Sequence, residues 1–107
     1  CQNNEGQIHE TESISAGLDY PGVSPIHCFL KDTKRARYTS ATDEEALTAY
    51  QLVKKYEKLN PSLEPSHAFA EAIKIAPRLS KDTICIVNSC GDAKKDRDIL
   101  KKRLGKN

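Results

Sequence analysis

A short segment rich in small residues, from Ser13 to Gly22, is the first candidate for chemistry in this sequence. It holds two glycines, a proline and one carboxylate, Asp19, and it has neither helical nor strand periodicity. Glycine and proline let the backbone turn sharply and expose its carbonyls to a neighbouring group. The pattern indicates a binding loop. The alternative is a plain connection in which Asp19 only favours a turn.

Two other sets of reactive side chains lie where strands are expected to end. Glu64 directly precedes Pro65, and its carboxylate either caps a helix through backbone amides or faces a bound ring or cation. Ser89 and Cys90 follow an apolar run that ends at Val87. A nucleophilic Cys90 thiol with His67 as its base is a further hypothesis, although no sequence signature supports it. We interpret His67, like His27, as structural, because the two histidines have no metal-ligand spacing.

The elements that must position these side chains follow from local signals. Pro25 suits the start of a short helix over 25–30. Thr42 and Glu45 form a capping box that begins a helix running to about residue 59. Pro65 suits the first turn of the next helix, which Pro77 ends. An extended piece is expected at 62–63, and the buried stripe of the helix after it is expected to be Ala68, Phe69, Ala72, Ile73 and Ala76.

Strands are predicted at 36–41 and at 83–87, and a basic helix at 95–104. The run 83–87 is continuously apolar and rich in β-branched residues, which is typical of a strand covered on both faces. Alternation of strands and helices predicts an α/β fold, a small parallel sheet with helices on its faces. Ligands bind at the carboxyl ends of such strands, so Thr42, Glu64 and Ser89 with Cys90 should converge. We expect a single domain, with a hairpin and the loop in 1–24 and βα units in 25–107.

Composition limits the classes of function. The chain has 107 residues and a formal net charge of +2, which is too small by itself to indicate nucleic acid as a partner. It has no apolar run of membrane-spanning length. Four cysteines (Cys1, Cys28, Cys85 and Cys90) form no C-x-x-C pair, and we expect reduced thiols, with Cys85 a small buried hydrophobe. The sequence therefore predicts a cytoplasmic protein, or a plastid one if the source is a plant or alga.

The loop also carries a resemblance to a known family. The segment from Gly6 to Gly22, with Ser24-Pro25-Ile26-His27 after it, is similar to the C-terminal part of tryptophan synthase β subunits. Three more matches follow in the same order, at residues 42–47, 63–68 and 86–91. The resemblance runs from about Gln2 to the last helix. It implies a fold type II pyridoxal-phosphate enzyme, of which this chain is a C-terminal fragment.

The resemblance also implies roles for residues at the cofactor. Glu64 matches the glutamate beside the pyridoxal ring, which affects protonation of the cofactor and its intermediates. Cys90 stands where the family has a serine whose hydroxyl binds the pyridine nitrogen, and Ser89 is its neighbour. A thiol is a weaker and longer partner than a hydroxyl. Cys90 therefore alters the cofactor site without clearly breaking it, since other enzymes of this fold type use cysteine there.

Further implied roles lie in the loop. Asp19 matches the aspartate that contacts the hydroxyl of the amino-acid substrate and switches between open and closed states. The backbone carbonyls of Tyr20 and Gly22 match ligands of a monovalent cation, Na⁺ or K⁺.

The implied reaction condenses L-serine with indole to L-tryptophan on pyridoxal phosphate. The family's Schiff-base lysine motif and its glycine-rich phosphate loop are absent from these 107 residues, so we expect the isolated chain to be inactive. Expected partners are the remainder of the β chain, a second β subunit and the α subunit, with no nucleic acid and no membrane. After Gly91 the segment 92–96 replaces the family's glycine, arginine, glycine and aspartate. This departure favours the alternative of a non-catalytic ligand-binding or regulatory module built from the same fold.

Overall fold

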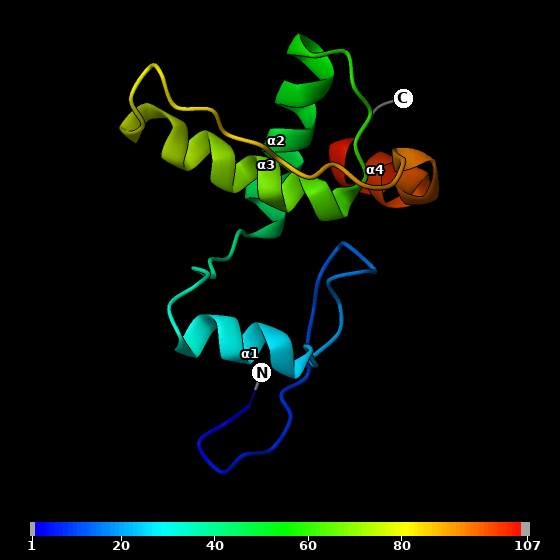
Figure 1. Ribbon diagram of the computed structural model, residues 1–107. Helices are drawn as coiled ribbons and strands as arrows, with labels where there is room; N and C mark the ends of the chain where they lie inside the picture. Colours follow the sequence, from blue (N-terminus) through cyan, green and yellow to red (C-terminus); the bar gives the residue numbers. More distant parts are fainter. Residues whose placement is uncertain (1, 106–107) are drawn as a thin grey trace. The chain divides into compact units, whose positions relative to one another are not determined.

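Short local signals shape this chain into helices joined by irregular segments (Figure 1). The computed structural model describes residues 2–105. Its α-helices are α1 (Pro25–Asp32), α2 (Asp43–Tyr56), α3 (Leu63–Ile75) and α4 (Arg97–Leu104), and its 3₁₀ helices are η1 (Ala76–Arg78) and η2 (Ala93–Asp96). The chain divides into two compact units after Thr39, which are described in turn.

The first unit begins with a tight turn and contains α1. The side-chain oxygen of Asn3 accepts the Glu5 and Gln7 amides, both at 2.9 Å, and an antiparallel bridge pairs Gln2 with Ile8. The predicted hairpin therefore exists as a single bridge. The expected helix at 25–30 is confirmed as α1, in which the Ile26 amide donates to the Ser24 hydroxyl.

The second unit is built on α2 and α3, which pack across each other (Figure 1). The predicted capping box is confirmed: Thr42 Oγ1 accepts the Glu45 amide at 3.2 Å, and Glu45 Oε2 accepts the Thr42 amide at 2.8 Å. Glu45 also pairs with Lys74 of α3 at 2.8 Å. The buried side of α2 comprises Ala46, Leu47, Ala49, Tyr50 and Val53. This face forms most of the apolar core of the unit.

The start and the buried face of α3 correct the sequence predictions. The helix begins at Leu63, with Ser62 as its N-cap in an extended conformation, so the extended piece expected at 62–63 is confirmed at Ser62 and wrong at Leu63. Pro65 then falls within the first turn, where backbone amides have no partner inside the helix, so proline breaks no bond there. The residues buried on α3 are Leu63, Pro65, Ser66 and Ala70, whereas Ile73 of the predicted stripe is 45% exposed. The predicted stripe is therefore not the buried face: Phe69 and Ala72 are partly buried, and Ala68, Ile73 and Ala76 are exposed.

The expected parallel sheet does not form within residues 2–105. The segments 36–41 and 83–87 are irregular there, and Ile84 and Ile86 are 87% and 89% exposed. Cys85 is exposed too, which corrects its interpretation as a buried hydrophobe. β-Branched residues favour an extended backbone, but a strand is stable only beside a neighbour that pairs its amides and covers its side chains.

The last part of the chain is anchored to the start of α3. After η1 the chain returns along α3 as an irregular segment, and Asp92 forms an antiparallel bridge with Pro61 (Figure 1). The Ala93 amide donates to the Asn60 carbonyl at 3.3 Å. The predicted basic C-terminal helix is confirmed as η2 followed by α4, with Ala93 and Leu100 buried. No helix in the described part of the chain has the length and apolar character needed to cross a membrane.

Candidate functional site

The turn that contains Cys90 lies against the helix start that carries Glu64. The Ser62 hydroxyl donates to the Cys90 carbonyl at 3.0 Å, across 28 residues of sequence. Gly91 makes this approach possible, because its φ is +83° and a Cβ there would lie 2.8 Å from Ser62 Oγ. Of the three segments expected to converge, those that contain Glu64 and Cys90 are therefore adjacent. A hydrogen bond between the helix start and the turn brings them together, and not the edge of a sheet.

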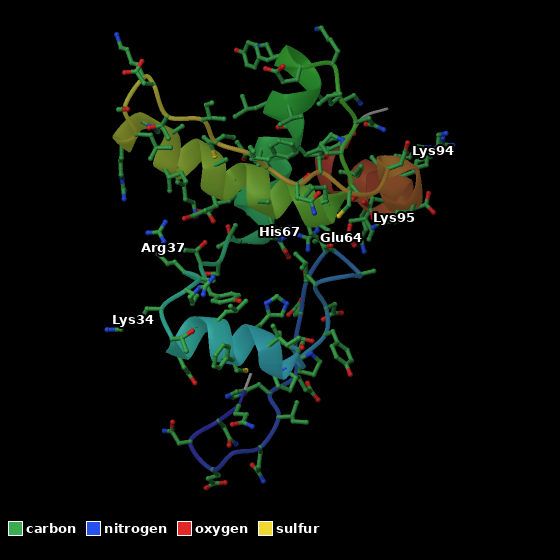
Figure 2. All side chains as sticks on the ribbon, viewed as in Figure 1. Lys34, Arg37, Glu64, His67, Lys94 and Lys95 are labelled. Atoms are coloured by element: carbon green, nitrogen blue, oxygen red, sulfur yellow. The ribbon has the colours of Figure 1, made fainter. Side chains whose placement is uncertain are left out.

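Glu64 is held by Lys95, which the sequence places at the start of the basic helix predicted at 95–104. Lys95 Nζ donates to both carboxylate oxygens of Glu64, at 2.9 and 2.8 Å, and to Asp96 Oδ1 at 2.9 Å (Figure 2). Asp96 is 3% exposed, and its other oxygen accepts the Leu63 amide at 2.8 Å. The Leu63 amide at the start of α3 thus donates to the Asp96 carboxylate, so Glu64 does not cap this helix, which corrects one of its two proposed roles. Ser62 occupies the N-cap position because the helix starts earlier than predicted.

Electrostatics keep Lys95 charged. Desolvation lowers its pKa, but hydrogen bonds and charge attraction from Asp96 and Glu64 outweigh it and raise the pKa above the ordinary value. The side chain of Glu64 is 21% exposed, and that of Lys95 is 47% exposed. Glu64 can therefore present a fixed carboxylate, with the Lys95 ammonium beside it, to a group that approaches from solvent. The sequence did not indicate the role of Lys95, because Glu64 lies 31 residues away and Asp96 is its immediate neighbour. The only signal in the sequence was the altered segment after Gly91.

The Cys90 and Ser89 side chains are exposed. Cys28, Cys85 and Cys90 are free thiols, in agreement with the expectation of reduced cysteines, and Cys1 lies outside the described residues.

His67 is not arranged as a base for Cys90. Its Nδ1 hydrogen-bonds the Leu63 carbonyl at 2.7 Å, and its Nε2 lies 3.8 Å from Asp43 Oδ1 (Figure 2). Both ring nitrogens therefore have partners within the α2–α3 pair, which supports the structural interpretation. His27 is likewise engaged, since its Nδ1 lies 2.9 Å from the Tyr38 hydroxyl. The hypothesis of a nucleophilic Cys90 thiol therefore has no support from His67 as its base.

The glycine-containing loop is folded around Ser15 in the first unit. The Ser15 carbonyl accepts the Leu18 and Asp19 amides at 3.0 and 3.1 Å, and this turn leaves Asp19 exposed. Tyr20 is 73% exposed, and its ring covers Gly22 so closely that a Cβ there would lie 3.0 Å from the ring. Asp19, Tyr20 and Gly22 thus share one short turn. Glu64, Ser89 and Cys90 belong to the other unit.

Metal-ligand side chains are not clustered in the described ranges: no group of three or more His, Cys, Asp or Glu side chains there could hold a metal ion. A cation site at Tyr20 and Gly22 would use backbone carbonyl oxygens as ligands instead of these side chains.

Comparison with known proteins identifies what the chain resembles. No family model matches it. It is 52% identical over 104 residues to the tryptophan synthase beta chain of Bordetella petrii, and 55% and 53% identical over the same length to those of Cereibacter sphaeroides and a Ruegeria species. Each match covers 97% of this chain but only 25–26% of the relative. The chain therefore spans about a quarter of the length of the curated relatives it matches, and the resemblance to this family is confirmed.

Proposed function

We propose that this chain, which is similar to tryptophan synthase β chains over nearly its whole length, supplies part of a pyridoxal-phosphate site. The complete protein would condense L-serine with indole to L-tryptophan and water. The observation that carries the proposal is the adjacency of the Cys90 turn and the Glu64 helix start, because these are the two places that the family resemblance assigns to the cofactor ring. When bound, pyridoxal phosphate acts as an electron sink for the amino-acid substrate.

The residues of the second unit would orient the cofactor ring. Glu64 would lie beside the ring as a carboxylate, with Lys95 restricting its rotation through two hydrogen bonds. The Cys90 thiol would face the pyridine nitrogen, and Ser89 lies beside it in the same turn. These residues fit the ring side of the site, since Cys90 is exposed and the Glu64 side chain is partly so.

The loop of the first unit would bind the amino-acid substrate. Exposed Asp19 would accept the hydrogen bond of the L-serine hydroxyl. The carbonyls of Tyr20 and Gly22 would hold Na⁺ or K⁺, because hard cations prefer oxygen ligands.

The remaining parts of the site would come from the rest of a β chain. This sequence holds neither the family's Schiff-base lysine motif nor its glycine-rich phosphate loop, so we expect the chain alone to be inactive. Exposed Ile84 and Ile86 support the pairing of 83–87 with strands of that remainder, which would complete the parallel sheet of fold type II. A second β subunit and an α subunit would be further partners, in the cytoplasm.

A chimera tests the proposal. The segment of the Cereibacter sphaeroides β chain that matches this sequence is replaced by the 107 residues, and tryptophan formation from L-serine and indole is measured. We expect product, and we expect Glu64→Gln to lower the rate by roughly 10²-fold or more, as for loss of a group that assists proton transfer. Glu57→Gln, an exposed position just after α2, is the matched control.

Two outcomes would contradict the proposal. One is a folded chimera that retains pyridoxal phosphate but forms no product, which is the behaviour of a non-catalytic module. The other is equal activity of Glu64→Gln and Glu57→Gln.

A further inference from the structure

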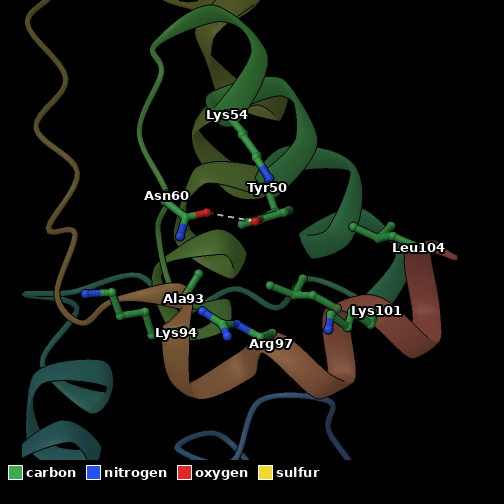
Figure 3. Close-up of a pocket in the computed structure, with 9 residues that line it drawn as sticks. Tyr50, Lys54, Asn60, Ala93, Lys94, Arg97, Lys101 and Leu104 are labelled. Atoms are coloured by element: carbon green, nitrogen blue, oxygen red, sulfur yellow. Dashed lines mark hydrogen bonds between the residues drawn. The ribbon is translucent and has the colours of Figure 1, made fainter. Parts of the chain in front are cut away.

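We infer that a groove between α2 and the η2–α4 segment binds a phosphate group (Figure 3). The cavity has a volume of about 310 Å³ and lies wholly within the second unit. Its lining includes Tyr50 of α2, Asn60, Ala93 of η2 and Leu100 of α4. Its size is at the lower end of the range for small-molecule sites, which begins at roughly 300 Å³.

The charges around this groove are all positive. Its lining includes four cations, Lys54, Lys94, Arg97 and Lys101, and no carboxylate. Within residues 2–105 none of these four takes part in an ion pair. Like charges around one cavity repel each other, and a bound anion would relieve that repulsion.

Helix electrostatics do not explain all four cations. Lys54 and Lys101 lie in the last turns of α2 and α4, where a cation complements the exposed carbonyls. Arg97 is the first residue of α4, where the partial charge of the helix is already positive. Its placement costs helix stability, so it favours a role outside the helix itself.

A hydrogen bond fixes a polar group at the border of the groove. The hydroxyl of Tyr50, which is 5% exposed, donates to Asn60 Oδ1 at 2.8 Å. This bond uses the Asn60 oxygen and leaves its amide NH₂ as a donor, on the side of the cavity where Arg97 extends (Figure 3). Lys54 Nζ lies 5.7 Å from the centre of the Tyr50 ring. The groove thus offers a guanidinium, an ammonium and an amide donor around one space.

This donor set matches the chemistry of a phosphate group. Arginine binds phosphate oxygens with two parallel hydrogen bonds, and lysine adds a point charge. The apolar wall formed by Leu100 and Leu104 would accommodate the carbon part of a phosphate monoester. The phosphate could come from the inorganic ion or from such an ester, and the experiment separates the two.

The test is a titration of the 107-residue chain in which two-dimensional NMR spectra record the chemical shifts of its amides at each step. The probes are inorganic phosphate and glycerol phosphate, each added at constant ionic strength set with sodium chloride. We expect saturable shifts of the Asn60 side-chain amide and of the Ala93 and Arg97 amides. The tighter of the two probes identifies the source of the phosphate group.

Matched double variants locate the binding. The double variant Lys54→Gln with Arg97→Gln should raise the dissociation constant for phosphate about tenfold or more, because two charge-assisted contacts are lost. Arg78→Gln with Lys81→Gln removes the same charge from exposed positions outside the groove and should leave binding nearly unchanged. Circular dichroism checks that both variants fold, and Lys101→Gln replaces the first variant if it does not.

Equal weakening by the two double variants, or shifts that grow linearly with no saturation, would overturn the inference. No pyridoxal compound is used, so failure here leaves the proposed function intact.

Discussion

At the scale of single residues, Asp96 links the parts of the second unit. It is buried, it accepts the first amide of α3, and it pairs with the lysine that holds Glu64. A buried carboxylate is stable only when its oxygens are satisfied, and here both have partners. The position of Glu64 therefore depends on a residue that no motif pointed to.

Replacing Asp96 tests this dependence. Asp96→Ala leaves the Leu63 amide without its acceptor and Lys95 with one carboxylate fewer, so we expect a loss of about 3 kcal/mol in the free energy of unfolding. Asp98→Ala, at an exposed first-turn position of α4, should cost less than about 1 kcal/mol. Urea denaturation measures both. Similar losses for the two variants would show that the Asp96 contacts do not stabilise the unit.

Gly91 provides a second residue-scale prediction. Gly91→Ala adds a side chain at φ +83° and 2.8 Å from Ser62 Oγ, whereas Gly105→Ala adds one at φ +65° in open space. We expect about 1 kcal/mol of destabilisation from the left-handed backbone alone in Gly105→Ala, and more in Gly91→Ala because of the clash. Thermal unfolding compares the two. Removal of the hydroxyl in Ser62→Ala should reduce the cost of Gly91→Ala, and an unchanged cost would contradict the clash.

At the scale of elements, the helices were predictable because their signals are local. Thr42 and Glu45 lie three residues apart, and Pro25 and Pro77 act at their own positions. The buried face of α3 was not predictable, since it depends on which neighbour covers the helix. The pattern suited a sheet on one side, but the helix buries Ser66 and Ala70 instead. The bond from Ser62 to the Cys90 carbonyl was invisible for the same reason, because it joins residues far apart in sequence.

The capping box should make stability depend on pH. Hydrogen bonds from Lys74 and from the Thr42 amide lower the pKa of Glu45 below its ordinary value of 4.5. A lowered folded-state pKa contributes stability above the unfolded-state pKa, and that stability is lost as the pH falls through the folded-state value. The difference in unfolding free energy between the original chain and Glu45→Gln should therefore be largest near neutral pH and shrink below pH 4.5.

Denaturation at a series of pH values measures this difference. Glu44→Gln removes a carboxylate from the same turn without removing a capping contact, so it serves as the control. A difference for Glu45→Gln that is constant with pH would contradict the assignment.

At the scale of the whole molecule, the exposed segment 83–87 is the largest departure from the predicted fold. The sequence predicted a strand covered on both faces there, and the segment is irregular and largely exposed instead. A sequence does not show whether the covering strands of such a segment lie in the same chain. Ile84 and Ile86 are almost fully exposed, and in a strand they would lie on the same side of the backbone. Exposed apolar segments with high strand propensity promote association through edge pairing.

We therefore expect the isolated chain to associate as its concentration rises, and Ile84→Lys with Ile86→Lys to suppress this. Ser80→Lys with Asn88→Lys adds the same charge at exposed positions nearby and should suppress association less. Sedimentation velocity over a range of concentrations distinguishes the variants. Equal suppression by both pairs would mean that net charge, and not the apolar segment, governs association.

The measurement that tests the central claim most directly is equilibrium dialysis of pyridoxal phosphate against two proteins. One is the isolated 107-residue chain, and the other is the chimera in which this chain replaces the matching quarter of a relative. If the chain supplies only the ring side of a cofactor site, the chimera retains the cofactor and the isolated chain does not. Stoichiometric retention by the isolated chain, or a folded chimera that retains none, would contradict this account.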